Sequence, residues 1–351
     1  MDNPIVVAVD AMGGDFAPRS AVTGAWNAVN AGARAILVGD RDRIRAELRR
    51  LAPEDAVAEL GDRLAIEHAE EVVAMEEPPA MVAKKRRSSL RICARLVREG
   101  RAQALVTAGN TGAAMIAAKT VIGAIPGVDR PALAGVFPTR QGRTVVLDVG
   151  ANLNAKVRHL RQFAVMGHFY AQEIIGTPAP RIGLMSVGEE ESKGTDLLRE
   201  VYRVLQTTGL NFVGNVEGRD LFRGTVDVIV CDGFVGNVML KSSESLVLFV
   251  ERLLQHELRR GLRTRLGAWL ARPAFERFRQ RLDWSEYGAA PLLGVRGGCF
   301  IGHGRSGAKA VRNAIRGAME FCAAQLHVKI ERKVAELHAQ EERLLGSRST
   351  P

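Results

Sequence analysis

The sequence predicts an α/β protein with a mainly parallel sheet sandwiched by helices, and a helical hairpin that protrudes from it. Three observations support this fold class. Short β-branched runs recur along the chain, each run is followed by a glycine-rich turn, and each turn opens a segment of helical periodicity. Strands that alternate with helices are typical of parallel sheets covered on both faces. Such sheets bind ligands beside the carboxyl ends of their strands, where these turns lie.

The β-branched runs predict strands at 5–9, 35–38, 104–107, 144–147, 182–187, 226–231 and 300–301. Helices are expected after 112 through about 121, near 160–175, near 197–207, after 237, and after 307 through about 326. Residues 1–327 are therefore expected to form one large α/β domain.

Two segments break the alternation. Residues 245–285 form an arginine-rich helical stretch with apolar residues at four-residue spacing, in which Pro273 is expected to kink or separate two helices. This stretch is the expected projection. It fits either a dimer or core-covering helix pair, or an interfacial membrane helix. Residues 328–351 are expected to be a charged helical tail that is partly disordered.

Composition limits the class of protein. The chain has 351 residues, of which 46% are hydrophobic and 25% are charged, which is ordinary globular usage. The formal net charge of +10 favours an acidic partner: nucleic acid, a phosphate compound, an anionic membrane or an acidic protein. The four cysteines form no CxxC pair, which argues against a disulfide framework or zinc cluster and fits a reducing cytosol.

Targeting signals are also not expected. The N-terminus has neither a basic region nor a long apolar stretch of the kind found in signal peptides. Unbroken apolar runs such as Leu246–Val250 are far shorter than the ~20 residues that span a bilayer, so we expect no membrane span. Binding to a membrane surface is not excluded by this argument.

One turn matches a known signature. Gly302, Gly304 and Gly307 have the spacing of the dinucleotide fingerprint after a short strand, but no acidic residue ends a strand ~20 positions later. What the turn does offer is backbone N–H groups at a helix N-terminus, which can bind an anion.

Polar side chains on several turns predict a shared pocket. A single glycine turn is most often only a tight connection, but several of them with polar side chains favour a ligand site. The candidates are Asn110, Thr111, Asn152, Lys193, Asp232, Asn237 and His303. Lys193 follows three glutamates and could equally form a surface ion pair, and His303 could equally be structural. Cys231 ends an apolar strand and fits a buried small hydrophobe better than a nucleophile.

A run of four cations, 84–87, precedes the helix expected near 90–99. Positive charge at a helix start opposes the helix dipole, so we expect acidic groups to compensate it.

These motifs together resemble one family, the bacterial phosphate acyltransferases (acyl-acyl-carrier-protein–phosphate acyltransferases). The resemblance covers about residues 4–325. It is carried in order by VAVDAMGGD at 7–15, TAGNTG at 107–112, DVGAN at 148–152, GEEESKG at 188–194, DGFVGN at 232–237, GAAPLLG at 288–294 and His303-Gly304. Asn154 and Ala155 depart from the family pattern, in which an aspartate and a cysteine are expected.

The resemblance implies a reaction and its setting. A fatty acyl group would move from acyl carrier protein to inorganic phosphate, giving acyl phosphate for phospholipid (phosphatidic acid) synthesis. It implies a fold similar to phosphotransacetylases and isocitrate-type dehydrogenases, a homodimer, and a cytoplasmic enzyme peripherally associated with the inner face of the cell membrane. A membrane glycerol-3-phosphate acyltransferase would use the product. No nucleic acid, metal or cofactor is expected.

The expected site follows from the matched motifs. The expected catalytic residues are Lys193, Asn237 and His303. Those expected to bind phosphate or acyl substrate are Asp10, Gly13, Gly14, Asp15, Gly109, Asn110, Thr111, Gly112, Asn152, Asp232, Gly233, Gly236 and Gly304. Those expected to dock the carrier protein are Lys84, Lys85, Arg86 and Arg87. Those expected to face the membrane are Leu258, Leu262, Leu266, Trp269 and Leu270.

The chemistry requires no acyl-enzyme. Phosphate is a nucleophile near neutral pH and a thiolate is a fair leaving group. Glycine-turn amides with Asn110, Thr111 and Lys193 are expected to hold phosphate. Asn237 is expected to steady the carbonyl oxygen, and His303 to protonate the departing thiolate.

Three rival interpretations exist. A phosphotransacetylase that uses acyl-coenzyme A would share the fold and the phosphate chemistry. An isocitrate-type dehydrogenase would need an aspartate cluster and a nucleotide site, and neither pattern is found. A nucleic-acid-binding module would explain the charge but not the polar turns.

Overall fold

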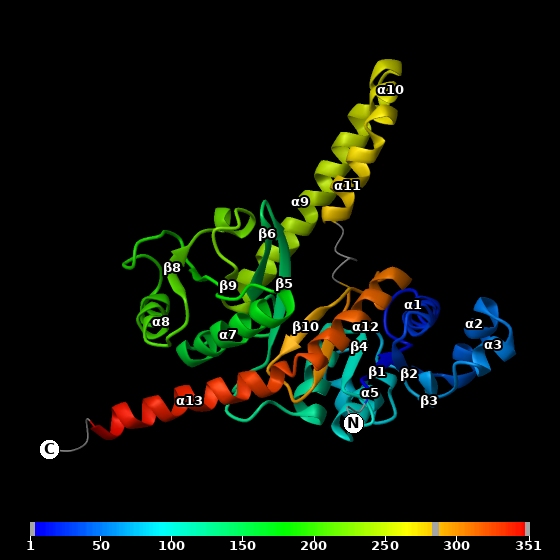
Figure 1. Cartoon of the computed structure of the whole chain (residues 1–351), viewed down its shortest axis with the longest axis horizontal. Helices are drawn as coiled ribbons and strands as arrows, with labels where there is room; N and C mark the ends of the chain where they lie inside the picture. The colour runs from blue at the N-terminus through cyan, green and yellow to red at the C-terminus, as the bar shows by residue number, and fades with distance from the viewer. Residues whose placement is uncertain (1–3, 283–287, 348–351) are drawn as a thin grey trace.

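The strands of this protein form one sheet, in the computed structural model that describes residues 4–282 and 288–347 (Figure 1). The strands are β1 (Val6–Asp10), β2 (Arg34–Gly39), β3 (Leu64–His68), β4 (Ala104–Thr107), β5 (Ala132–Thr139), β6 (Gly142–Leu147), β7 (Ile182–Met185), β8 (Phe212–Val216), β9 (Val228–Val230), β10 (Ala290–Leu293) and β11 (Gly298–Ile301). Their order across the sheet is β3-β2-β1-β4-β11-β10-β5-β6-β9-β7-β8.

The helices surround this sheet. The α-helices are α1 (Arg19–Asn30), α2 (Arg41–Leu51), α3 (Glu54–Ala58), α4 (Met81–Lys84), α5 (Ser89–Arg98), α6 (Thr111–Ala117), α7 (Val157–Tyr170), α8 (Asp196–Gln206), α9 (Gly233–Arg259), α10 (Leu262–Leu270), α11 (Arg272–Leu282), α12 (Ala308–Ala323) and α13 (Leu326–Ser347). Short turns η1 (Gly61–Arg63), η2 (Ala118–Ile122), η3 (Ala171–Ile175) and η4 (Gly218–Phe222) connect or extend them.

The sheet consists of two parallel blocks. Strands β3, β2, β1, β4 and β11 are parallel, as are β6, β9, β7 and β8. Between the blocks lie β10 and β5, and each pairing from β11 through β10 and β5 to β6 is antiparallel. The predicted mainly parallel sheet is therefore confirmed, but the two blocks run in opposite directions.

The carboxyl ends of both blocks meet at the centre of the sheet. Ile301, the last residue of β11, pairs with Ala290 at the start of β10, whereas Leu147 at the end of β6 pairs with Ala134 of β5. Both ends therefore lie at the level of β10, whose four residues span about 10 Å. Because strands are spaced ~4.8 Å apart, β11 and β6 lie about 14 Å apart across the sheet. The turns after these strands can therefore line one cleft.

Side chains of the strands alternate between two hydrophobic cores, which follows from the two-residue period of a strand. Val7 and Val9 of β1 pack into one core with α1, α7, α12 and α13, whereas Ala8 packs into the other with α5 and α6. Helices thus cover both faces, as predicted.

A helical projection rises from this body (Figure 1). It consists of the outer part of α9 with α10 and α11, and Pro273 lies at the start of α11, where the sequence predicted a kink or a break. Its exposed apolar side chains include Leu262 (84% exposed), Leu266, Trp269 and Leu270.

The long helix α13 extends from the body in another direction (Figure 1). Ile330, Val334 and Leu337 are buried in the core that contains α7, and Lys329 forms an ion pair with Glu173 at 2.6 Å. The domain limit expected at residue 327 therefore lies inside a helix whose first turns pack on the body.

Candidate active site

A cleft of about 500 Å³ lies between α9 and α12 above β5 and β10. Three predicted site residues from three different helix starts line it: Thr111, Asn237 and His303. The sequence reasoning missed four cations that also line this cleft: Arg143, Lys241, Arg305 and Arg316. The sequence could have indicated two of these cations, because Lys241 lies one helical turn after Asn237 and Arg305 lies within the last glycine turn.

The glycine turns after β1, β4 and β11 are interlocked. The backbone N–H of Asp15 donates to the carbonyl of Gly304 at 2.8 Å, and a Cβ added at Gly13 would lie 2.7 Å from the backbone nitrogen of Gly109. Gly14 has a φ of +94°, a conformation that favours glycine. These glycines therefore let three turns pack closely, and two of the turns lead to Thr111 and His303, which both line the cleft.

Asp10 supports these turns from beneath. It is 4% exposed, and its carboxylate accepts hydrogen bonds from the Thr107 hydroxyl at 2.8 Å and from the Met12 N–H at 3.1 Å. Burial raises the pKa of the Asp10 carboxyl. Asp10 joins β1 to β4 and does not line the cleft.

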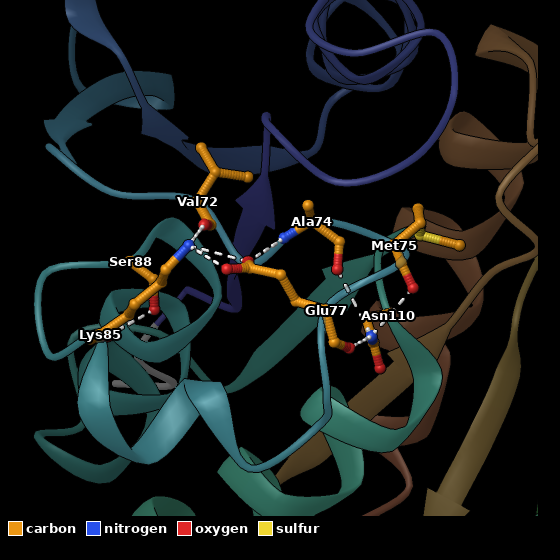
Figure 2. Close-up of polar contacts among 7 residues, drawn as sticks. All are labelled: Val72, Ala74, Met75, Glu77, Lys85, Ser88 and Asn110. Carbon is orange, nitrogen blue, oxygen red and sulfur yellow. Dashed lines mark hydrogen bonds and ion pairs between the residues drawn. The ribbon is translucent and has the colours of Figure 1, made fainter.

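Asn110 is held by protein groups on both sides of its amide, and Figure 2 shows the contacts of the amide nitrogen. Its Oδ1 accepts from the Ala113 N–H at 3.0 Å, which caps α6, while its Nδ2 donates to the carbonyls of Met75 at 3.2 Å and Glu77 at 2.9 Å. In turn Lys85 donates to the Glu77 carboxylate at 2.8 Å. The structure thus uses Asn110 to fasten loop 74–77 over α6, and Asn110 does not line the cleft.

Asp148 organises the turns of the second block. It is fully buried after β6, and its carboxylate accepts hydrogen bonds from the N–H groups of Leu133, Gly150 and Ala151. The Asn152 side chain donates to the same carboxylate at 2.9 Å. Burial raises the pKa of Asp148, and these donors oppose that shift. Asn152 is buried in this network, and it borders a second cavity.

Close packing against Asp148 positions α9. A Cβ added at Gly236 would lie 1.9 Å from the carbonyl oxygen of Asp148, and one added at Gly233 would lie 2.8 Å from its Oδ2. The Asp232 side chain accepts from the Val235 N–H at 2.8 Å and caps the helix. Asn237, one residue after Gly236, is thereby held in the cleft near Gly150.

His303 is exposed in the cleft on the turn after β11. Its Nδ1 accepts a hydrogen bond from the Arg305 N–H at 3.2 Å. In the neutral imidazole this bond leaves the proton on Nε2, the nitrogen that can donate to a ligand.

Lys193 lies on loop 188–194 after β7, two strands away from β6. It is exposed and is not among the residues that line the cleft. The expected alternative, a surface ion pair, is not found among residues 4–282 and 288–347, since the nearby Glu189 pairs with Arg219 at 2.7 Å.

Two cations of the run 84–87 are neutralised, as their position at a helix start predicts. Lys85 pairs with Glu77 at 2.7 Å and Arg87 with Glu70 at 2.6 Å. Lys84 and Arg86 are exposed and have no carboxylate partner in the part of the chain that the structure describes.

The projection bears on the expectation that the chain has no membrane span. In the described part of the chain, helix α9 alone is long and apolar enough to cross a membrane, on length and composition only. The argument from unbroken apolar runs overlooked it because polar residues interrupt its apolar stretch. Of the residues expected to face the membrane, Leu258 is only half-buried, whereas the four on α10 are exposed.

A cysteine nucleophile is disfavoured. Cys231 is buried, and burial raises the pKa of its thiol well above the usual value; for Cys299 burial raises the pKa to about 12. The prediction that Cys231 acts as a small hydrophobe is confirmed. Within the described residues, no group of three or more His, Cys, Asp or Glu side chains is placed to hold a metal ion.

Comparison with known proteins decides the family. A model of the family described as "Fatty acid synthesis protein" matches residues 5–329. A phosphate acyltransferase of Pelotomaculum thermopropionicum is 51% identical over 316 residues, which is 90% of each chain. One from Koribacter versatilis is 52% identical and covers 95% of this chain and 93% of its own. The chain belongs to the phosphate acyltransferase family. It is therefore an acyltransferase, as the resemblance implied.

Solved structures agree on the fold. A phosphotransacetylase from Streptococcus pyogenes superposes with a TM-score of 0.63 at 15% identity, over 91% of this chain and 94% of its own. A branched-chain phosphotransacylase from Enterococcus faecalis superposes with a TM-score of 0.53 at 14% identity, over 90% and 98%. The predicted likeness to the phosphotransacetylase fold is confirmed.

Proposed function

We propose that this enzyme transfers a fatty acyl group from the thioester of acyl carrier protein to inorganic phosphate. The observation that carries the proposal is the cleft that Thr111, Asn237 and His303 line together, in a chain of the phosphate acyltransferase family. The product, an acyl phosphate, would supply an acyl group for phosphatidic acid synthesis.

We place the phosphate-binding site at the start of α12. Of the three helix starts at the cleft, α6 is capped by Asn110 and α9 by the acidic Asp232, whereas Gly307 offers α12 no side-chain cap. A helix start without a capping side chain favours an anion near its first N–H groups. Arg305 lies beside them and has no carboxylate partner among the described residues.

The reaction then needs two more groups. The bound phosphate oxygen attacks the thioester carbonyl, forming a C–O bond, and the tetrahedral intermediate expels the thiolate. The Asn237 amide would donate to the oxyanion. The Nε2–H of His303 would protonate the departing sulfur, and His303 would regain the proton that hydrogen phosphate loses as the acyl phosphate forms. The chain's own residues thus supply orientation, charge stabilisation and a relay for one proton.

The identity of the acyl donor can be tested directly. Purified protein is incubated with phosphate and either acyl carrier protein thioester or acyl-coenzyme A, and acyl phosphate is trapped with hydroxylamine. We expect the carrier thioester to give the higher kcat/KM. Equal or better use of acyl-coenzyme A would favour a phosphotransacetylase-type enzyme.

We keep Lys193 in the proposed phosphate site because of its positive charge. It is an exposed ammonium without a carboxylate partner among the described residues, and its loop follows β7 at the same sheet edge as the turn that bears Asn237. Lys193→Ala is expected to raise the KM for phosphate about 10- to 100-fold, the range for losing one charged hydrogen bond. Lys193→Arg should restore part of it. Wild-type kinetics in Lys193→Ala would remove Lys193 from the site.

The carrier protein is acidic in this proposal and would dock on the exposed Lys84 and Arg86. Lys85 and Arg87 would act indirectly, because their salt bridges with Glu77 and Glu70 hold the run 84–87 in place. We also propose a homodimer in the cytoplasm, bound peripherally to the inner face of the membrane, where a membrane glycerol-3-phosphate acyltransferase would take the product.

The projection would provide the membrane contact. The α10 side chains Leu262, Leu266, Trp269 and Leu270 are exposed beside arginines, the composition of an interfacial helix. Trp269→Glu is expected to weaken binding to vesicles of phosphatidylglycerol and phosphatidylcholine at least about 10-fold, because burying one large apolar side chain contributes ~1.5–3 kcal/mol. Sedimentation with vesicles measures this. Val213→Glu, on strand β8 of the body, is the matched control, and equal losses in both variants would contradict the assignment.

A further inference from the structure

A second cavity, of about 420 Å³, lies beside the cleft. Its walls include the apolar side chains of Met115, Ile116 and Leu292, and two cations, Lys119 and Arg130, lie at its boundary. Neither the sequence motifs nor the reaction proposed above uses these two cations. Their combination with an apolar wall fits an elongated ligand that carries a negative charge at one end.

The charge of the two cations is not compensated locally. Within residues 4–282 and 288–347, neither Lys119 nor Arg130 has a carboxylate partner, and Asp129 is already paired with Arg158 at 2.7 Å. Arg130 lies close enough to His159 to help lower its pKa, although burial is the larger cause. An anion between Lys119 and Arg130 would thus meet favourable charge without displacing an existing salt bridge.

The lining of the second cavity includes residues that are close in the chain to the run 84–87 and to the lining of the cleft. At one side Pro79 contacts Gly112, close enough that a Cβ on Gly112 would lie 2.6 Å from Pro79, and Pro79 precedes α4, which ends at Lys84. The cavity is also lined by Gly112 itself and by Ala151, whose chain neighbours Thr111 and Gly150 line the cleft. A chain-like ligand could therefore run from the docking surface to the reacting atoms.

We propose that this second cavity receives the phosphopantetheine arm of the acyl donor, and that Lys119 and Arg130 bind the phosphodiester of that arm. This inference rests on the proposed function. The arm is an extended chain of two amides and a dimethyl group, with a phosphodiester at the carrier end and the thioester at the other. The cation pair would anchor the first end, so that the thioester reaches His303 and Asn237.

The test removes the charge from protein and substrate in turn. Lys119→Gln and Arg130→Gln are assayed with acyl carrier protein thioester and with acyl-pantetheine, which lacks the phosphate. We expect each variant to raise the KM for the carrier thioester about 10-fold or more, to leave the KM for inorganic phosphate within about twofold, and to use acyl-pantetheine as well as wild type does. Arg45→Gln on α2, an equal loss of charge far from the cavity, should match wild type throughout.

Other results would overturn the proposal. A raised KM for inorganic phosphate would make the pair part of the phosphate site, and an equal loss with acyl-pantetheine would make it structural. Acyl-coenzyme A also carries the phosphate, so comparing its KM with that of the carrier thioester identifies the source of the arm. If wild type forms no acyl phosphate from any donor, the proposed function fails. Calorimetric binding of free phosphopantetheine, lost in Lys119→Gln, would still support the second cavity, whereas no binding to wild type would refute it.

Discussion

His303→Gln is expected to lower kcat for acyl phosphate formation about 100- to 10,000-fold, the usual range for losing a general acid. His303 is exposed in the cleft, and its Nδ1 accepts from the Arg305 N–H, so in the neutral imidazole Nε2 carries the proton. The KM for phosphate should change little, because the α12 start and Arg305 remain in place. Steady-state kinetics with hydroxylamine trapping measures both.

A merely structural histidine would behave differently. If His303 protonates the thiolate, a donor with a more acidic thiol leaving group should be used by His303→Gln with a much smaller deficit. His256→Gln on the projection is the control and should keep wild-type kcat. An equal deficit with both donors would assign His303 to positioning, and a wild-type kcat would remove it from the reaction.

Gly236→Ala is expected to destabilise the protein by at least about 3 kcal/mol, at the upper end for overpacking, and to abolish most activity. The added Cβ would lie 1.9 Å from the Asp148 carbonyl oxygen and 3.0 Å from the Cα of Val149, and backbone atoms cannot move aside as a flexible side chain can. Moving α9 would also displace Asn237 from the cleft.

The control for this substitution is another helical glycine. Gly267 of α10 has no atom within 4 Å of an added Cβ, so Gly267→Ala should stabilise the helix by about 0.5–1 kcal/mol or leave it unchanged. Denaturant unfolding compares the two. A Gly236→Ala protein as stable as wild type would show that the turn after β6 can shift, and would weaken the argument that α9 is positioned by Asp148.

Local patterns predicted the parallel strands well and the central antiparallel strands poorly. Seven β-branched runs correspond to strands, but β5 and β10 were missed because Gly135, Pro138 and Pro291 interrupt them. The outer strands β3 and β8 were missed too, since both are only partly buried and lack a long apolar run. Strand pairing is non-local, so a residue's partners across the sheet leave little trace in its neighbours along the chain.

The candidate site, like the sheet, was predicted only in part from local patterns. The turns after β4, β9 and β11 predicted Thr111, Asn237 and His303, and these three do line one cleft. Asn110 looked equally suitable, yet its amide is committed to loop 74–77, more than thirty residues earlier.

The sequence by itself determined the α/β class, the polar turns at strand ends and the family, because each depends on residues close together in the chain. The tertiary structure decided which turns meet. Three antiparallel pairings reverse the second block, and the short β10 brings the carboxyl ends of β11 and β6 to one level. It also decided which cations are free, since Lys85 and Arg87 are neutralised while Arg305, Lys119 and Arg130 have no carboxylate partner in the described residues. Which turns meet and which cations are neutralised both depend on contacts between residues that are distant in the sequence.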